Sequence, residues 1–465
     1  MNTVKLLTPF AVGLLIWLAG HPADLSPDAW QLFAIFVGTI VGVILKPLPM
    51  PAVALTALFV TSITRTVPFS EALKGFSHEV VWLIVFAYFV AIGFIKSGLG
   101  TRISTFFLML LGKRSLGLAY GLACTETILA PAIPSASARA GGVVYPLVES
   151  LSLTYDSKPN HPSRSRIGTF LAMVAFQCNT VTGAMFLTAM AANPLAARLA
   201  EPYGFSLTWG TWALAASLPG ILSLILVPLL IYFLYPPEVK ETPLAKEFAQ
   251  KRLEDLGPMK QKEWLMLGIF SILILLWVFG SFFGLSATLV ALMGLVFLFL
   301  FKVIEWKDAL REEGAWTTLI WFSILLMMAT ELNNLGFTSW FGSWITTQLT
   351  GLHVGVAVTL TFLIYFYSHY FFASNTAHVG ALFAPFLAVA TSLGAPAALS
   401  ALLLAFYSNL FGGLTPYGSG PAAIYYGSGY VPLRSFWVLG FLCSVLNLAI
   451  WSLVGALWWN ILGLW

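Results

Sequence analysis

Long apolar stretches separated by short polar or glycine-rich segments run along nearly the whole chain. A helix that crosses the roughly 30 Å hydrocarbon core of a bilayer needs about 20 residues, and many of these stretches have that length or nearly so. The predicted spans lie at about 7–20, 30–46, 50–64, 170–192, 209–235, 264–283, 287–303, 352–372, 394–411 and 435–463. Backbone in lipid must satisfy its own hydrogen bonds, and the alternating pattern of a membrane β-barrel is absent. The pattern therefore predicts an all-α polytopic membrane protein.

One polar connector interrupts this pattern near the middle of the chain. Residues 236–263 hold 12 of the 42 charged residues, and six of these charges are Lys or Arg. Basic residues accumulate in cytoplasmic loops, so we expect a cytoplasmic linker here. The chain then divides into an N-terminal half (1–235), the linker (236–263) and a C-terminal half (264–465).

The composition excludes several classes of protein. Of the 465 residues 59% are hydrophobic and only 9% are charged, whereas an ordinary globular domain has about 25% charged residues. This rules out a soluble enzyme, and a net charge of +4 gives no indication of a nucleic-acid partner. The three cysteines lie in apolar runs without metal-ligand spacing, so we expect no metal or cofactor.

The two halves resemble each other. Residues 135–146 align with 374–385 at an offset of 239, with four identities in twelve positions: Ser135 with Ser374, Ala138 with Ala377, Gly141 with Gly380 and Pro146 with Pro385. The same offset places Trp82 on Trp321, and an offset of 230 places the Phe-x-x-Asn sequence at 176–179 on that at 406–409. Such repeats in a helical membrane protein favour a secondary transporter with its site between the halves, near the bilayer midplane.

Broken helices indicate where that site lies. Residues 131–142 are rich in Pro, Ser, Ala and Gly, residues 374–376 are three consecutive polar residues, and 412–421 is a Gly/Pro-rich run. Unwound backbone at membrane depth is tolerated only in protein or beside a cavity. The helix N-termini that such breaks create offer free N–H groups and a positive dipole end, which suit a carboxylate.

Two basic residues occupy matched positions in the repeats. Arg139 and His378 each follow the first serine of their repeat by four residues. An ionisable residue within the membrane is costly and usually functional, so the pair indicates two cations at one site and an anionic ligand with more than one charge. In the alternative interpretation, Arg139 reaches a membrane interface from a helix end and His378 is a neutral packing residue.

The candidate site also includes hydroxyl, amide and backbone groups of both halves. The predicted substrate-binding residues are Ser135, Ala136, Ser137, Ser374, Asn375, Thr376, Ser419 and Pro421. Hydroxyls in kinked membrane helices also bond within their own helix, which is the alternative for the serines. Three further ionisable residues stay outside the predicted site: Glu126, whose contact with Arg139 the sequence cannot establish, Glu331 at an expected hairpin end, and His369 in expected helix packing.

At these residues the chain resembles the divalent anion/sodium symporter family, which carries a Ser-Asn-Thr motif at the tip of each of two re-entrant hairpins. The second motif is present unchanged at 374–376, followed by Thr-Pro at 415–416 and Gly-Ser-Gly at 427–429. The first is Ser-Ala-Ser at 135–137, without the asparagine, and the surrounding Pro-Ser-x-Ser-Ala-Arg-x-Gly-Gly is similar to the exchanger branch. That branch includes 2-oxoglutarate/malate translocators and citrate/succinate antiporters.

The resemblance implies a specific architecture. We expect two inverted repeats, each with a re-entrant hairpin and an interrupted helix, and hairpin tips near 135–139 and 374–378. It also implies a homodimer in the cell inner or plasma membrane, in which a mobile transport domain moves against a rigid scaffold in an elevator-like step.

The departure at the first motif bears on mechanism. In the symporter branch, sodium ions beside the tips supply positive charge for the dianion. Here Arg139 and His378 are predicted to compensate the charge in place of sodium. Moving an uncompensated Arg through the bilayer costs about 2.5–3.5 kcal/mol, or roughly 100-fold in rate. A bound dicarboxylate offsets that charge, so we expect sodium-independent exchange of di- or tricarboxylates.

Other functions remain as alternatives. The nearest is a sodium-coupled dicarboxylate symporter that uses the motif at 374–376. An intramembrane enzyme would need a nucleophile with a base or a metal-binding cluster, and no such motif is present. A channel is disfavoured because there is no ring of like charges. The sequence does not choose among 2-oxoglutarate, malate, succinate, fumarate, citrate and tartrate.

Overall fold

The computed structural model describes residues 3–348 and 353–465. Regular structure in these residues is helical, with one isolated bridge between Arg114 and Glu241 and no named strand. Helices long and apolar enough to cross a bilayer are α2 (Pro27–Leu45), α5 (Glu79–Ser97), α12 (Trp209–Leu234), α14 (Gln261–Phe279), α17 (Glu313–Asn334), Val354–Phe371 and Leu433–Ile461. The prediction of an all-α polytopic membrane protein is confirmed.

The predicted spans overlap helices throughout, although residue 352 lies outside the described residues. Two crossing helices, α5 and α17, were missing from the predicted spans and are the apolar runs that contain Trp82 and Trp321. Shorter apolar helices are α1 (Thr3–Leu18), α3 (Met50–Ile63), α6 (Leu99–Leu111), α7 (Ser115–Leu129), α15 (Ala287–Leu300) and α21 (Ala397–Leu410). The remaining helices outside the repeats are α4 (Phe69–Ala72), η1 (Lys74–Ser77), η3 (Pro162–Ser165), η5 (Glu201–Tyr203), η6 (Gly280–Phe283) and α16 (Trp306–Arg311).

Each repeat contains a helical hairpin whose tip is not helical. In the first, α7 leads to the tip and the chain returns through α8 (Ala136–Arg139), the π-helical η2 (Ala140–Val144) and α9 (Tyr145–Thr154). In the second, α18 (Phe337–Gln348) precedes α19 (Val354–Tyr367) and η7 (Ser368–Phe371), and the return helix is α20 (Asn375–Ser392). Pro146 and Pro385 occupy matched positions in the two return segments, and proline removes one helical hydrogen bond at each.

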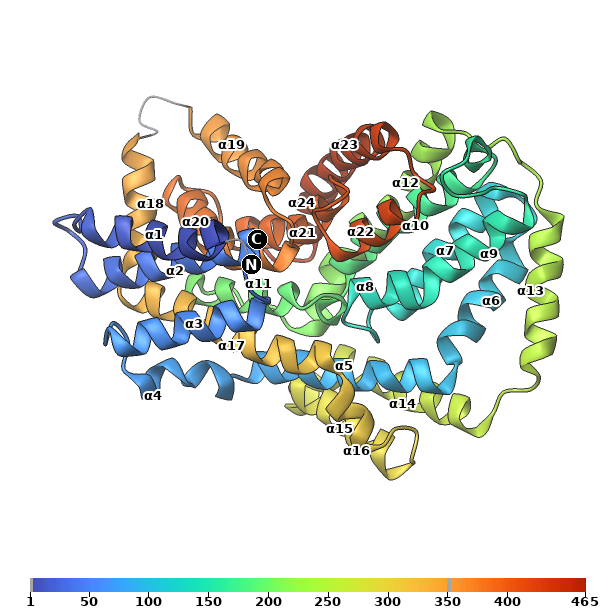
Figure 1. Cartoon of the computed structure of the whole chain (residues 1–465), viewed down its shortest axis with the longest axis horizontal. Helices are drawn as coiled ribbons and strands as arrows, with labels where there is room; N and C mark the ends of the chain where they lie inside the picture. Colours follow the sequence, from blue (N-terminus) through green and yellow to red (C-terminus); the bar gives the residue numbers. More distant parts are fainter. Residues whose placement is uncertain (1–2, 349–352) are drawn as a thin grey trace.

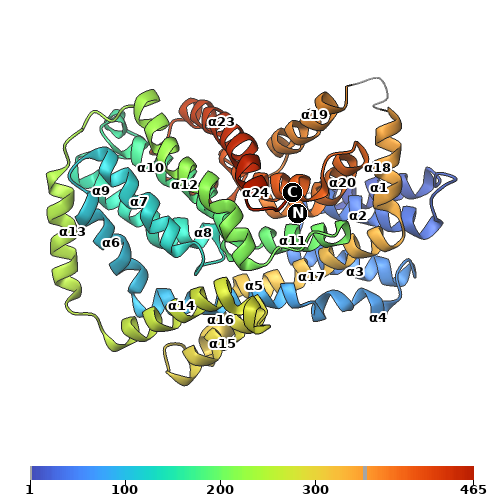
Figure 2. The same ribbon diagram turned by 180° about the vertical axis from the view of Figure 1, so that it is seen from behind.

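Each repeat also contains an interrupted helix. In the first, α10 (Gly168–Met185) ends before η4 (Leu187–Ala189), and α11 (Ala192–Ala200) continues the chain. In the second, α21 ends at η8 (Phe411–Gly413), and α22 (Gly420–Gly427) begins after a break. A crossing helix follows each unit: α12 in the first, and α23 (Leu433–Ala449), η9 (Ile450–Gly455) and α24 (Ala456–Ile461) in the second. Figure 2 shows α10 and α12 side by side, in agreement with their contacts.

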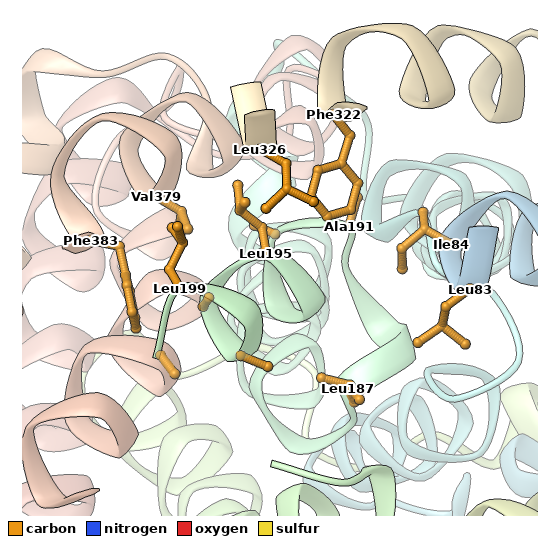
Figure 3. Close-up of a cluster of buried hydrophobic side chains, with 14 of the residues drawn as sticks. Leu83, Ile84, Leu187, Ala191, Leu195, Leu199, Phe322, Leu326, Val379 and Phe383 are labelled. Carbon is orange, nitrogen blue, oxygen red and sulfur yellow. The ribbon is translucent and has the colours of Figure 1, made fainter. Parts of the chain in front are cut away.

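The short helix α11 packs at the centre of the apolar core (Figure 3). It contacts α5, α17, α20 and α21, and Leu195 and Leu199 point toward Phe322 and Val379 of α17 and α20. Its alanines are buried. Small residues allow helix backbones to approach closely, and this close packing stabilises contacts between helices in a membrane, where the hydrophobic effect contributes little. The break before α11 is therefore held in place by helices of both halves.

The charged linker contains a helix, α13 (Pro243–Leu256), which packs along α6 at one edge of the molecule (Figure 1). The Arg102 guanidinium donates to Glu263 Oε1 over 2.6 Å and to the carbonyl of Gly257 over 2.9 Å. These contacts tie the linker to the first half of the chain. Its cytoplasmic location and the division into domains at 235 and 263 remain predictions.

Candidate functional site

A cavity of about 320 Å³ lies where the two hairpin tips meet the second helix break. Its lining includes all eight predicted substrate-binding residues: Ser135, Ala136, Ser137, Ser374, Asn375, Thr376, Ser419 and Pro421. The repeat and the breaks thus indicated residues from three distant segments that the fold brings together. Their role in binding stays a prediction.

Three serines begin helices at this cavity in the same way. Ser135 Oγ accepts from the N–H of Ala138 over 3.1 Å, and Ser374 Oγ accepts from the N–H of Ala377 over 3.3 Å. Ser419 repeats the arrangement at α22 with the N–H three residues on, also over 3.3 Å. Each serine is an N-cap that satisfies one of the free N–H groups of the first turn.

The N-terminal ends of three helical segments therefore meet at one cavity. First-turn N–H groups that the caps leave free, together with the positive end of each helix dipole, favour an anion. Among the residues that the structure describes, no side chain lining the cavity carries a full charge. The lining thus offers hydrogen-bond donors and dipoles to a carboxylate.

The crossing helices complete the cavity from the other side. Tyr88 of α5, together with Thr317, Thr318 and Trp321 of α17, lines it, as does Met50 at the start of α3. These residues were not predicted as site residues from the sequence. Trp321 was recognised only as a marker of the repeat, and threonines in an apolar helix give no signal of which face meets a cavity.

Two asparagines at matched repeat positions hold the broken segments and also line the cavity. Asn179 donates to Glu126 Oε1 over 3.0 Å and to the Ala136 carbonyl over 3.3 Å. Asn409 donates to Asn193 Oδ1 over 2.7 Å, and Asn193 in turn donates to carbonyls at the first break. The repeated Phe-x-x-Asn sequence marks both asparagines, but from the sequence it indicated only the alignment of the two halves.

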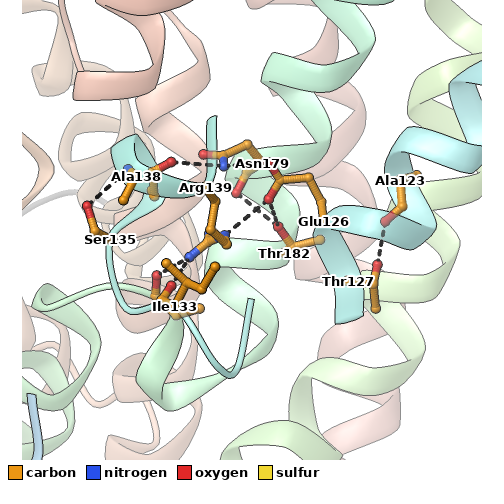
Figure 4. A network of polar contacts seen from close by, with 11 residues as sticks. Ala123, Glu126, Thr127, Ile133, Ser135, Ala138, Arg139, Asn179 and Thr182 are labelled. Atoms are coloured by element: carbon orange, nitrogen blue, oxygen red, sulfur yellow. Dashed lines mark hydrogen bonds and ion pairs between the residues drawn. The ribbon is translucent and has the colours of Figure 1, made fainter. Parts of the chain in front are cut away.

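Arg139 lies behind the first tip, not in the cavity lining (Figure 4). Its guanidinium is fully buried, and Nε is 3.1 Å from Glu126 Oε2. Its Nη1 donates to the carbonyls of Ile133 and Ala189 over 2.6 and 2.7 Å. It therefore joins the hairpin tip to the break before α11.

This pairing corrects two expectations. We expected Arg139 to face the cavity without a partner and left Glu126 outside the site. Glu126 instead neutralises the guanidinium, and also accepts from Asn179 and, over 3.5 Å, from Thr182. An empty carrier therefore does not move an uncompensated charge at Arg139, because Glu126 moves with it.

His378 likewise lies behind the second tip and outside the cavity lining. It is fully buried, its Nδ1 is 3.0 Å from Nδ1 of His369, and its ring stacks on Phe372 and Phe411. His369 is itself buried and packed against Phe372 and Phe411, and it also contacts the other basic residue of the repeat. That contact was not predictable from the sequence, because the two histidines belong to different helical segments.

Acceptor atoms without partners gather near the second tip. Asn375 Oδ1 and Thr415 Oγ1 are buried and have no hydrogen-bond partner among the described residues. A Cβ added at Gly412 would lie 2.9 Å from Asn375 Oδ1, so the second break runs close against this amide. Oxygen acceptors of this kind suit a donor or a hard cation.

Comparison with known proteins places this architecture in a family. The family described as the sodium:sulfate symporter transmembrane region matches residues 1–465. The Bacillus subtilis protein YflS is 50% identical over 466 residues, covering 100% of this chain and 98% of that protein. Dicarboxylate transporter 2, chloroplastic, of Spinacia oleracea is 46% identical, with 99% and 83% covered, and the L-tartrate/succinate antiporter of Escherichia coli is 35% identical, with 98% and 97% covered.

A solved structure shares the fold. The YdaH transporter of Alcanivorax borkumensis superposes with a TM-score of 0.54 over 88% of this chain and 89% of that one, at 15% identity. The match extends over both repeats and agrees with the predicted fold class. The chain is thus a multi-pass integral membrane protein and belongs to the sodium:sulfate symporter family, the divalent anion/sodium symporter family that its motifs indicated.

Proposed function

We propose that this protein exchanges di- or tricarboxylates of the 2-oxoglutarate, malate and succinate class across the membrane, without sodium. The observation that carries the proposal is the position of Arg139 Nη1, which donates to the carbonyls of Ile133 and Ala189. Carbonyl oxygens are ligands that a hard cation would use. At the first tip a cation that cannot dissociate binds them instead.

The cavity supports an anionic substrate. Helix N-termini capped by Ser135, Ser374 and Ser419 meet there, and the hydroxyl and amide groups around them can donate to two carboxylates. Relatives named as a dicarboxylate transporter and a tartrate/succinate antiporter support the same class of substrate and the same exchange mode.

Exchange follows from these N-termini and does not require a free Arg charge. When the site is empty, the first-turn N–H groups that the serines do not cap have only water as an acceptor, and a group that loses this water in apolar surroundings costs several kcal/mol. Bound carboxylates accept from them, so the loaded site moves more readily than the empty one. We propose an elevator-like movement of the two hairpins against α5 and α17 within a homodimer.

A sodium-coupled dicarboxylate symporter is the second candidate. It is favoured by the unpartnered buried acceptors Asn375 Oδ1 and Thr415 Oγ1 beside the second tip. These atoms would ligate a cation there, while Arg139 occupies the equivalent place at the first tip. The two candidates differ in whether sodium is needed when the anion binds.

Thermal unfolding of the purified protein tests the proposal. A ligand at 100 times its Kd stabilises the folded state by about 2.7 kcal/mol. We expect at least one of 2-oxoglutarate, malate, succinate, citrate or tartrate to raise the midpoint equally in sodium and in choline buffer. Acetate, with a single carboxylate, is the control and should have little effect. Stabilisation that appears only in sodium would favour the symporter, and no stabilisation by any of the acids would contradict the substrate class.

A further inference from the structure

A buried pair of histidines lies directly behind the second hairpin tip. His369 of η7 and His378 of α20 are fully buried, and their Nδ1 atoms are 3.0 Å apart. Two protonated Nδ1 atoms cannot face each other as donor and acceptor, so at least one ring is neutral and the pair holds at most one positive charge. Phe411 of η8 stacks on both rings, at centroid distances of 4.0 and 4.3 Å.

The outer nitrogens of the pair connect it to two different segments. His369 Nε2 is 3.0 Å from the carbonyl of Gly418, and His378 Nε2 is 3.3 Å from Ser368 Oγ. A carbonyl only accepts, so His369 Nε2 carries a hydrogen. In the neutral pair, His369 Nδ1 then accepts from His378 Nδ1, and His378 Nε2 carries no hydrogen. The Ser368 hydroxyl beside it donates to the Tyr365 carbonyl over 2.9 Å. His369 thereby selects the tautomer of His378.

The Gly418 carbonyl precedes a residue of the cavity. Ser419 follows directly, caps α22 and lines the cavity beside both hairpin tips. A Cβ at Gly418 would lie 2.7 Å from Thr415 Oγ1 and 2.9 Å from His369 Nε2, so this close approach needs glycine. The Tyr417 hydroxyl donates to the Tyr370 carbonyl over 3.0 Å. Two neighbouring contacts therefore join the second break to η7.

The first repeat contains a comparable connection. There Arg139 donates to the Ile133 carbonyl at the tip and to the Ala189 carbonyl at the break. The offset of 230 that aligns the interrupted helices places Ala189 on Ser419, one residue beyond Gly418. A basic side chain thus holds a carbonyl of the break in both halves, but in the second half that side chain is His369.

We propose that His369 is a positioning residue for substrate binding, which fixes the tautomer of His378 and, through the Gly418 carbonyl, holds Ser419 and the N-terminus of α22 toward the substrate carboxylate. This role rests on the proposed dicarboxylate exchange. We expect loss of the Gly418 contact to weaken substrate binding more than loss of the His378 contact. The reason is that Gly418 directly precedes Ser419, which lines the cavity.

Two substitutions separate the contacts of His369. In His369→Asn, the side-chain oxygen stands where Nδ1 was, so the contact with His378 is kept and that with Gly418 is lost. In His369→Gln, the amide nitrogen stands where Nε2 was, so the Gly418 contact is kept. Both lose the ring that stacks on Phe411, so stacking does not contribute to the difference between them.

Half-saturation and maximal rate of exchange in proteoliposomes provide the readout. We expect H369N to raise the KM for the external dicarboxylate about tenfold while the maximal rate changes by less than about twofold, and H369Q to raise KM by less than about threefold. Equal KM values in the two variants, or a fall in maximal rate alone, would overturn the proposal. His353→Asn is the matched control: it makes the same change at the exposed N-cap of α19, which lies in the same span as His369, and asparagine can also cap a helix. It should leave KM unchanged.

A second variant and a second measurement keep the role of His369 testable if H369N does not fold or does not transport. Gly418→Ala places a Cβ 2.7 Å from Thr415 Oγ1 and 2.9 Å from His369 Nε2, so it crowds the contact between His369 and the carbonyl without removing the ring. It should raise KM as H369N does, and an unchanged KM would contradict the role. Thermal stabilisation by the same acid should rank the variants in the same order without any transport step. If the wild type exchanges none of the acids, the proposed function fails; if it does and H369N binds as tightly as H369Q, only the role of His369 fails.

Discussion

Arg139→Ala should abolish dicarboxylate exchange in sodium-free buffer and lower the free energy of unfolding by about 3–5 kcal/mol. The substitution leaves the Glu126 carboxylate buried without its cation and frees the carbonyls of Ile133 and Ala189. An unpaired buried charge is strongly destabilising, and the tip loses its link to the break before α11. Exchange in proteoliposomes and thermal unfolding of the purified variant measure the two effects.

A double variant separates the effect on stability from the effect on transport. In Arg139→Met/Glu126→Gln both charges are removed together, and replacing a buried ion pair by neutral groups of similar volume is often close to neutral for stability. The carbonyls of Ile133 and Ala189 still lose their donor, so we expect the double variant to unfold at a temperature between those of Arg139→Ala and the wild type, and still not to exchange dicarboxylates. Exchange at the wild-type rate in either variant would remove Arg139 from the mechanism.

Asn375→Asp should weaken dicarboxylate binding by more than about 100-fold at neutral pH, because two unit charges about 4 Å apart repel by about 4 kcal/mol at an effective dielectric constant of 20. The substitution changes little in shape, and Asn375 lines the cavity beside the second tip. The added carboxylate would face the substrate carboxylates, whereas the amide can donate to them. Affinity from ligand-induced thermal stabilisation is the measurement.

The matched control places the same new charge away from the cavity. Asn334 is exposed at the end of α17 and contacts Glu331 only within its own turn. Asn334→Asp should leave the affinity within about twofold of the wild type, because exposed charges are screened by salt. Undiminished affinity in Asn375→Asp would show that the anion does not bind against the second tip.

Much of the fold, and the part of the site lining that the hairpin tips and the second break contribute, followed from the sequence for physical reasons. The length of the apolar stretches predicts the membrane spans. They must be helices, because backbone N–H and C=O groups cannot stay without hydrogen bonds in lipid. Serine followed by small or polar residues in apolar surroundings predicts where helices restart, and the repeat pairs Ser135 with Ser374. These are local signals, and they suffice for the part of the site that consists of helix N-termini.

Contacts between segments were not predictable in the same way. Glu126 and Arg139 are thirteen residues apart on opposite sides of a hairpin tip, so no helical periodicity relates them. His369 and His378 meet across a similar turn. The repeat suggested two matched cations in the cavity, but both side chains lie behind the tips. There Arg139 donates to two carbonyls and His378 contacts the ring of His369.

Exchange in proteoliposomes without sodium tests the central claim most directly. Labelled 2-oxoglutarate is supplied outside in choline buffer to vesicles that contain either unlabelled malate or no dicarboxylate. We predict rapid uptake into the malate-loaded vesicles and little uptake into the empty ones, with or without an inward sodium gradient. Uptake into empty vesicles driven by the sodium gradient would contradict the central claim that this protein exchanges dicarboxylates without sodium.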